Sequence, residues 1–165
     1  MAAGPTYEPI ATTTLGSTSS SVIFNSISGS YTDLVLIISA KNTTGQNYET
    51  WLRFNSDSGS NYSQTFLQNY AGSTQSGRNS NINQITPGKM NTTSFDANII
   101  NINNYSNATT NKTVLSRVNN GEFVAGVLIG LWRNTAAITK IEALTEPGTN
   151  YTAGSTFTLY GIKAA

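Results

Sequence analysis

The chain has 165 residues, of which 38% are hydrophobic and 10% aromatic, so one domain with a packed core is the simplest organisation. Charged residues make up only 10%, against about 25% in ordinary globular proteins, and the net charge is +1. Duplex binding needs several Lys or Arg contacts to phosphates, and the nine basic residues form no run, so we expect no nucleic acid or charged membrane surface as partner.

Short runs of strand-forming residues, separated by Gly, Asn and Ser, follow one another along the chain. In chain order the expected strands are Ile10–Thr14, Val22–Ile27, Tyr31–Ala40, Tyr48–Asn55, Ser63–Tyr70, Phe95–Asn103, Lys112–Val118, Glu122–Arg133, Ile138–Thr145 and Ser155–Lys163. No segment combines a helix cap, an amphipathic stripe and a stop signal. The pattern predicts an all-β protein, an antiparallel sandwich or barrel of about eight to ten short strands.

Two of these runs are apolar on both faces, namely Leu34–Ile38 and much of Phe123–Trp132. In contrast, Tyr48–Asn55 alternates between apolar and polar residues, as in a sheet with one solvated side. We therefore expect the two apolar runs to be central strands, covered on both sides either by a second sheet or by a partner subunit.

The connections are expected to take three forms. Asn120-Gly121 lies between two strand-like runs and predicts a hairpin with a type I′ turn. Residues 71–93, rich in Ser, Asn and Gln, are expected to form an exposed polar excursion from a single sandwich domain at 1–165. Residues 1–9 contain Gly and Pro and are expected to form an extended N-terminal arm.

The chain contains neither His nor Cys. Ser-His-Asp and Cys-His nucleophiles are thus excluded, and zinc loses both of its favoured ligand types. No phosphate-binding or dinucleotide-binding Gly-rich motif is present. No membrane-length apolar run occurs, and the start, MAAGPTYEP, does not resemble a signal peptide, so we expect synthesis in a cytoplasm. We expect this protein to have no enzymatic activity and to bind neither a cofactor nor a metal.

Carboxylates are the remaining candidates for catalysis. They are Glu8, Asp33, Glu49, Asp57, Asp96, Glu122, Glu142 and Glu146. Two of them could form a glycosidase pair, which needs carboxyl groups about 5–10 Å apart. Most flank turns or alternate with apolar residues, as solvated positions do, and this interpretation is the favoured one.

The segment Asn55–Asn61, with the sequence NSDSGSN, resembles the front of a calcium loop. The twelfth position of such a loop should be a bidentate Glu, but counting from Asn55 it is Phe66. The flanks are also strand-like, whereas an EF-hand loop joins helices. We expect a hairpin-like turn, formed by Asp and Asn side-chain caps and a Gly with positive φ.

Four aromatic residues, Trp51, Tyr62, Tyr70 and Tyr105, lie near Asn and Asp donors in the sequence. They are expected either to form a sugar-stacking platform or to anchor a protein interface, where Trp and Tyr are enriched.

Three parts of the chain together resemble a family of tailed-phage virion structural proteins, of the type found in phages of cyanobacteria and other marine bacteria. The matching parts are Tyr31–Leu36 (YTDLVL) preceded by Thr13–Ser17 (TTLGS), Leu52–Ser63 (LRFNSDSGSNYS), and Asn104–Thr113 (NYSNATTNKT) with Gly130–Thr139 (GLWRNTAAIT) and Gly154–Ile162 (GSTFTLYGI). The resemblance spans nearly the whole chain, with 71–93 its least characteristic part.

This resemblance implies a β-sandwich of jelly-roll type and a place in the virion. Because the chain shows no fibrous repeat, we expect a non-enzymatic capsid decoration (cement) protein, a homotrimer that binds the outside of the major capsid protein lattice. The alternative is a tail-fibre or receptor-binding domain that recognises host surface glycans. A carboxylate-based glycan hydrolase on the virion is the least favoured class. The resemblance assigns no partner-binding residues.

Overall fold

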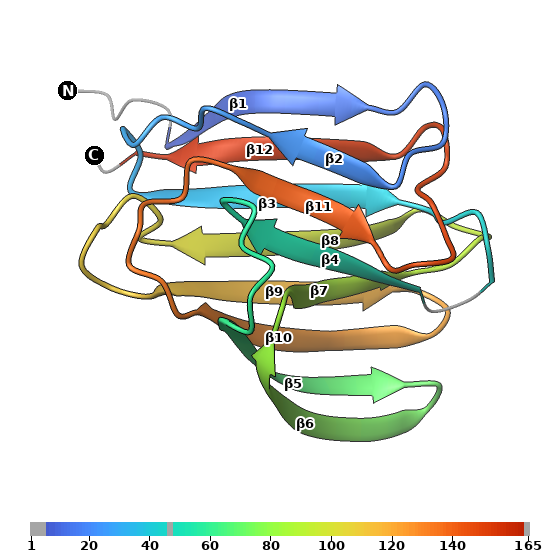
Figure 1. Ribbon diagram of the computed structural model, residues 1–165. Coiled ribbons are helices and arrows are strands. Elements are labelled where there is room, and N and C mark those ends of the chain that lie inside the picture. The colour runs from blue at the N-terminus through green and yellow to red at the C-terminus, as the bar shows by residue number, and fades with distance from the viewer. Residues whose placement is uncertain (1–5, 46–47, 164–165) are drawn as a thin grey trace.

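In the described part of the chain, twelve strands form two antiparallel sheets, which pack face to face as Figure 1 shows. The computed structural model describes residues 6–45 and 48–163. These residues contain no helix, and hence none long and apolar enough to span a membrane. The strands are β1 (Tyr7–Thr14), β2 (Ser21–Phe24), β3 (Asp33–Ala40), β4 (Tyr48–Phe54), β5 (Tyr62–Tyr70), β6 (Ser73–Ile82), β7 (Ile85–Met90), β8 (Asp96–Asn103), β9 (Lys112–Asn120), β10 (Val124–Trp132), β11 (Ile141–Thr145) and β12 (Thr156–Ile162).

The larger sheet has the order β1-β12-β3-β8-β9-β10-β5-β6, and the smaller has the order β2-β11-β4-β7. The chain passes between the sheets at every connection except β5–β6, β8–β9 and β9–β10, an arrangement compatible with a jelly roll. The hairpins β5–β6 and β9–β10 widen the larger sheet. In Figure 1, β5 and β6 extend beyond the edge of the smaller sheet. The all-β sandwich expected from the sequence is confirmed.

Alternating side chains supply the core between the sheets. In β9 every second residue is buried, from Lys112 to Asn120, while the residues between them are exposed. In β3 the inward-facing Leu34, Leu36 and Ile38 are fully buried. The smaller sheet contributes Leu52 and Phe54 from β4 to the same core.

All ten expected strands are present, but the sequence pattern missed two. The expected excursion at 71–93 instead contains β6 and β7. β6 is polar and largely exposed, and it joins the sheet through backbone pairing with β5, so its sequence has no apolar alternation. β7 contains Pro87 and Gly88, and a Pro fits there because β7 is an edge strand.

The expected arm at residues 1–9 is only partly within the described structure. Residues 1–5 lie outside the described residues. Tyr7 to Pro9 are not an arm but part of β1, where they pair with Ile162 to Tyr160 of β12. Pro9 precedes a β-bulge on this edge strand, a position that needs no backbone donor.

The hairpin expected at Asn120-Gly121 exists, but its turn is not type I′. Neither residue has positive φ, and Asn120 pairs with Val124, which leaves a three-residue connection. The Asn120 Oδ1 atom instead accepts hydrogen bonds from the backbone N–H groups of Glu122 and Phe123, both at 3.1 Å. Positive φ at both central residues occurs in the β5–β6 hairpin, at Ala71 (48°) and Gly72 (84°).

Candidate functional site

The motif Asn55–Asn61 forms the crossover turn between β4 in the smaller sheet and β5 in the larger one. Asn55 and Ser56 have φ of 51° and 58°, and Asp57 N donates to Phe54 O at 2.9 Å. A turn was expected here, but pairing of its flanks as a hairpin is wrong, because β5 pairs with β6 and β10. The expected positive φ also lies on Asn55 and Ser56 and not on Gly59.

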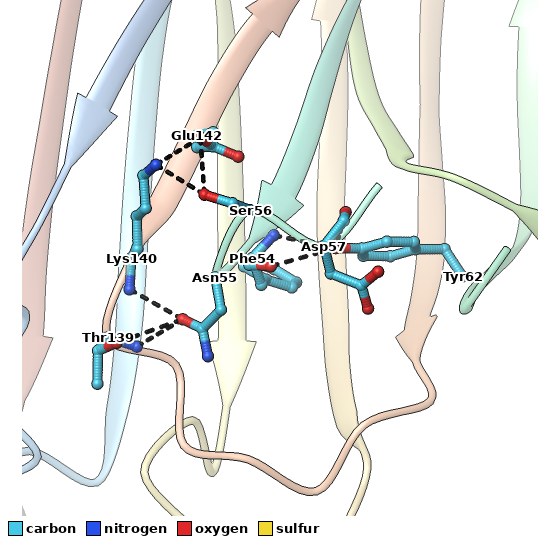
Figure 2. A network of polar contacts seen from close by, with 8 residues as sticks. All are labelled: Phe54, Asn55, Ser56, Asp57, Tyr62, Thr139, Lys140 and Glu142. Atoms are coloured by element: carbon cyan, nitrogen blue, oxygen red, sulfur yellow. Dashed lines mark hydrogen bonds and ion pairs between the residues drawn. The ribbon is translucent and has the colours of Figure 1, made fainter. Parts of the chain in front are cut away.

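Side chains of this turn connect β4 to the segment before β11, as Figure 2 shows. Asn55 Oδ1 accepts from the backbone N–H groups of Thr139 (2.9 Å) and Lys140 (3.1 Å). Ser56 Oγ lies 2.7 Å from Lys140 Nζ and 3.3 Å from Glu142 Oε1. The side chains of Asn55 and Ser56, which suggested a binding loop, are therefore engaged within the protein.

Asp57 connects the turn to the aromatic core. Its carboxylate accepts from Trp132 Nε1 at 2.7 Å, from Asn61 Nδ2 at 2.9 Å and from Gly59 N at 2.9 Å. Burial would raise the pKa of Asp57, but these three hydrogen bonds outweigh it and lower that pKa. The Trp132 ring is fully buried and lies 6.3 Å from the stacked ring of Tyr62.

Calcium binding by this motif gains no support from the geometry. Phe66, where a bidentate Glu would be needed, lies in β5, and its ring covers Gly77 of the neighbouring strand β6. Within residues 6–45 and 48–163, no three His, Cys, Asp or Glu side chains gather into a possible metal site.

Each of the eight carboxylates has a partner in the described chain. Ion pairs join Glu8 to Lys163 (2.7 Å), Glu49 to Lys89 (3.0 Å) and Glu142 to Lys140 (2.7 Å). Backbone or side-chain donors reach the others: Asn104 N to Asp33, Trp132 Nε1 to Asp57, Asn91 N to Asp96, Thr93 Oγ1 to Glu122 and Glu49 N to Glu146. These contacts suit structural roles.

Among the described residues, Asp96 is the one buried carboxylate, 3% exposed at the start of β8. Its Oδ2 accepts from Asn91 N at 3.1 Å and from Asn120 Nδ2 at 3.0 Å. Burial raises the pKa of Asp96 to about 6, the charge of Glu122 adds to this, and hydrogen bonds from Asn91 and Ser94 oppose it. The groove lined by Glu122 and Asn120 does not include Asp96, so its carboxylate joins strand ends inside the protein.

The four aromatic residues expected as a platform are not placed together on the surface. Tyr62 and Tyr105 are fully buried in the core, where the Tyr105 hydroxyl donates to Ser28 O. Trp51 lies on the solvent side of β4 beside Arg53, and Tyr70 lies at the end of β5 near Lys89. A stacking platform made of all four residues is therefore wrong.

A groove of about 220 Å³, here called the side groove, lies where β5 and β6 extend beyond the edge strand β7. Its lining includes Gln64, Phe66, Gln68, Asn79, Thr86 and Lys89. Gln64 is held by two hydrogen bonds to Thr86, at 2.7 and 2.9 Å. Within the described chain, the side-chain amide of Asn79 has no hydrogen-bond partner and is exposed to solvent. The side groove can therefore offer the amides of Gln68 and Asn79 beside one aromatic ring, and its lining also includes the Glu49–Lys89 ion pair.

The solvent side of the larger sheet, here called the outer face, carries the largest exposed apolar side chains of the widened region. Leu67, Leu115, Val127 and Ile129 are 54%, 40%, 43% and 56% exposed. They form two direct cross-strand pairs, Leu115 with Ile129 and Leu67 with Val127. We call these four residues the apolar strip. Val127 and Ile129 belong to one of the two runs expected to be covered on both faces, and the second sheet covers only the inner face.

Sequence reasoning did not bring these four residues together, because β5, β9 and β10 become neighbours only through the sheet order. The available signal was the apolar residues on both faces of Phe123–Trp132. Comparison with protein-family models, with curated proteins and with solved structures gives no match.

Proposed function

We propose that this chain is a non-enzymatic virion structural protein of a tailed phage. Its role is that of a capsid decoration (cement) protein, which binds the outside of the major capsid protein lattice as a homotrimer and works in the virion. The proposal starts from the resemblance of three segments to that family. It is supported by the all-β sandwich, which is the fold class that the resemblance implies.

The observation on which the proposal rests is the apolar strip. Large exposed apolar patches on soluble domains mark protein contacts, because leaving them in water costs free energy. The four side chains of the strip are 40–56% exposed and directly adjacent. A cement protein would bury such a strip against neighbouring subunits, and the added interface would resist the internal pressure of packaged DNA. With 10% charged residues, few ion pairs would be screened by salt.

Two measurements test this function. A cryo-EM map of the virion that carries this protein should show its density on the outside of the capsid. Particles lacking the protein should break at lower temperature or under milder osmotic shock than complete ones. Density confined to the tail, or unchanged resistance of the depleted particles, would contradict the cement role.

The alternative is a tail-fibre or receptor-binding domain that recognises host glycans, and the side groove favours it. The amide of Asn79 and the side-chain oxygen of Gln68, beside the Phe66 ring, suit a polyhydroxyl ligand. A host-polysaccharide array should then give hits that Asn79→Ala loses. Asn119→Ala, which changes an exposed amide on the outer face, is the matched control. An array without hits would remove the support for this alternative.

A further inference from the structure

The residues of the outer face can be identified from the strand register. One row of paired residues runs across the sheet from β12 to β5 and consists of Thr158, Ile37, Ile99, Arg117, Val127 and Leu67. The next row runs between the same strands and consists of Tyr160, Val35, Asn101, Leu115, Ile129 and Thr65. Beyond the apolar strip these rows contain Arg117 and Asn101, then the half-buried Ile99 and Ile37, and Val35, which is 4% exposed.

Charge distinguishes the outer face from the opposite side of the sandwich. Among the described residues that the register places on the outer face, the charged ones are Asp33, Arg78 and Arg117. The solvent side of the smaller sheet instead carries the Glu49–Lys89 pair and Glu142, paired with Lys140. Depletion of Lys and Glu, with Arg retained, is the composition of the buried centre of a protein interface.

Neither arginine of the outer face forms an ion pair within the described chain. Arg117 lies between Ile99 and Val127 in the register, and Arg78 lies opposite Thr65. The one carboxylate of this face, Asp33, is at the start of β3 and accepts from Asn104 N. A second copy packed by the same face would bring two arginines against a single, already engaged carboxylate. Charge complementarity therefore favours a different chain that supplies its own carboxylates.

The size of the outer face is sufficient for a specific complex. A sheet of eight strands, spaced about 4.8 Å apart and about 26 Å long, presents about 1,000 Å² on one face. A standard protein interface buries about 800 Å² on each partner. The outer face alone can therefore provide a full interface without help from the strand edges.

We infer that the outer face, centred on the apolar strip, is the docking surface, and that its occupant is an apolar surface of another protein with carboxylates opposite Arg117 and Arg78. The inference rests on the proposed function, in which that occupant is the capsid lattice. It adds an orientation: the smaller sheet, with its Glu–Lys pairs, faces solvent on the particle.

The test measures co-sedimentation of the full chain with particles of the encoding virus from which this protein has been removed. Ile129→Asp and Val127→Asp place a charge in the apolar strip, and we expect each to weaken binding about tenfold or more. Ile23→Asp is the matched control, because Ile23 is 42% exposed on β2 of the smaller sheet. It should bind like the wild type. Thermal melting verifies that each variant is folded.

A second pair of variants changes the side chain of Arg117, an exposed residue whose substitution should leave the fold intact. Arg117→Glu should weaken binding about tenfold or more, and Arg117→Lys should weaken it less because it keeps the positive charge. Equal binding by Arg117→Glu and the wild type would overturn the acidic character of the partner.

The remaining outcomes test the docking face independently of the proposed cement function. Wild-type binding that Ile129→Asp and Val127→Asp both retain would overturn the docking face and leave the cement role standing. No binding by the wild type would overturn the cement role and this partner together. Sedimentation of the free protein completes the test: an oligomer that Ile129→Asp dissociates would identify a second copy as the occupant and overturn the inference.

Discussion

At the scale of single residues, Asp57 determines the conformation of the crossover turn. Its carboxylate accepts hydrogen bonds from the indole of Trp132 and from Asn61, so one side chain connects the turn to the core. We expect Asp57→Ala to destabilise the fold by about 1–3 kcal/mol, because the buried indole N–H loses its acceptor. Chemical denaturation measures this loss. Asp57→Asn, which keeps one oxygen, should lose less, and equal losses would contradict the role of the acceptor.

Because the pKa of Asp57 is lowered in the folded protein, the contribution of this residue to stability depends on pH. The stabilising contribution of Asp57 is fully present above the unfolded pKa of 3.8 and is lost as the pH falls through the lower folded pKa.

The assignment of Asn55–Asn61 as a turn also predicts how the protein responds to removal of metal. A chelator should leave the melting temperature unchanged, since the carboxylate is used by protein donors. A clear drop on adding the chelator would show that the motif binds calcium after all.

Asp96 has the opposite pH behaviour. Its folded pKa of about 6 exceeds the unfolded value of 3.8, so the folded protein binds more protons between these values. The contribution of Asp96 to stability should therefore fall as the pH rises from about 4 to 6 and then level off. Asp96→Asn should remove this slope and, at pH 7, stabilise the protein by up to about 3 kcal/mol. Urea denaturation at pH 4 and pH 7 measures the effect.

The amide of Asp96→Asn keeps an oxygen to accept from Asn91 N and Asn120 Nδ2, and its NH₂ can donate to Ser94 Oγ. Glu122→Gln is the companion variant, because it removes only the neighbouring charge and should reduce the slope in part. A variant Asp96→Asn less stable than the wild type at pH 7 would mean that the ionised carboxylate is required.

At the level of strands and turns, the hairpins β5–β6 and β9–β10 differ in whether their turns require a glycine. Gly72 has φ of 84° in the β5–β6 turn, whereas Gly121 lacks positive φ and a Cβ there would meet open space. We expect Gly72→Ala to cost about 1 kcal/mol and Gly121→Ala to stay within about 0.5 kcal/mol. Thermal melting compares the two. The sequence pattern assigned the type I′ turn to Gly121, so a larger loss there would restore that assignment.

These hairpins also show where sequence prediction of strands works and where it fails. Strand β4 could be predicted because its apolar and polar residues alternate, and β10 because much of it is apolar on both faces. β6 was missed because an exposed edge strand is held by backbone hydrogen bonds, which any polar sequence can make. The turn at Asn120 differed from expectation because its side chain caps the connection, and a dipeptide pattern does not include that contact.

At the scale of the whole molecule, the two sheets share one core that includes residues from both, such as Leu36 of β3 and Leu52 of β4. We therefore expect thermal unfolding in a single transition, with far-UV circular dichroism and the fluorescence of the buried Trp132 changing together. An earlier transition by circular dichroism alone would indicate that strands distant from Trp132 unfold separately from the rest of the sandwich.

The candidate surfaces were less predictable than the fold. The run Phe123–Trp132 indicated that a face would need cover, but not which residues would surround it. Leu67 and Leu115 meet Val127 and Ile129 only because the larger sheet has the order β9-β10-β5. The predicted aromatic platform was wrong for the same reason. Tyr62 and Tyr105 are of a residue type that stacks on sugars, but they fill the core.

Three properties could be predicted from the linear chain: an all-β protein that is a sandwich or a barrel, the lack of His and Cys chemistry, and a turn at Asn55–Asn61. These properties follow from local periodicity, composition and spacing, which a linear chain displays directly. The folded structure was needed to establish that the sheets form a sandwich, that the turn crosses between them, that Asp57 binds the Trp132 indole, and that four apolar side chains form a strip on one face. Those properties depend on contacts between residues far apart in the chain, which strand order and register create.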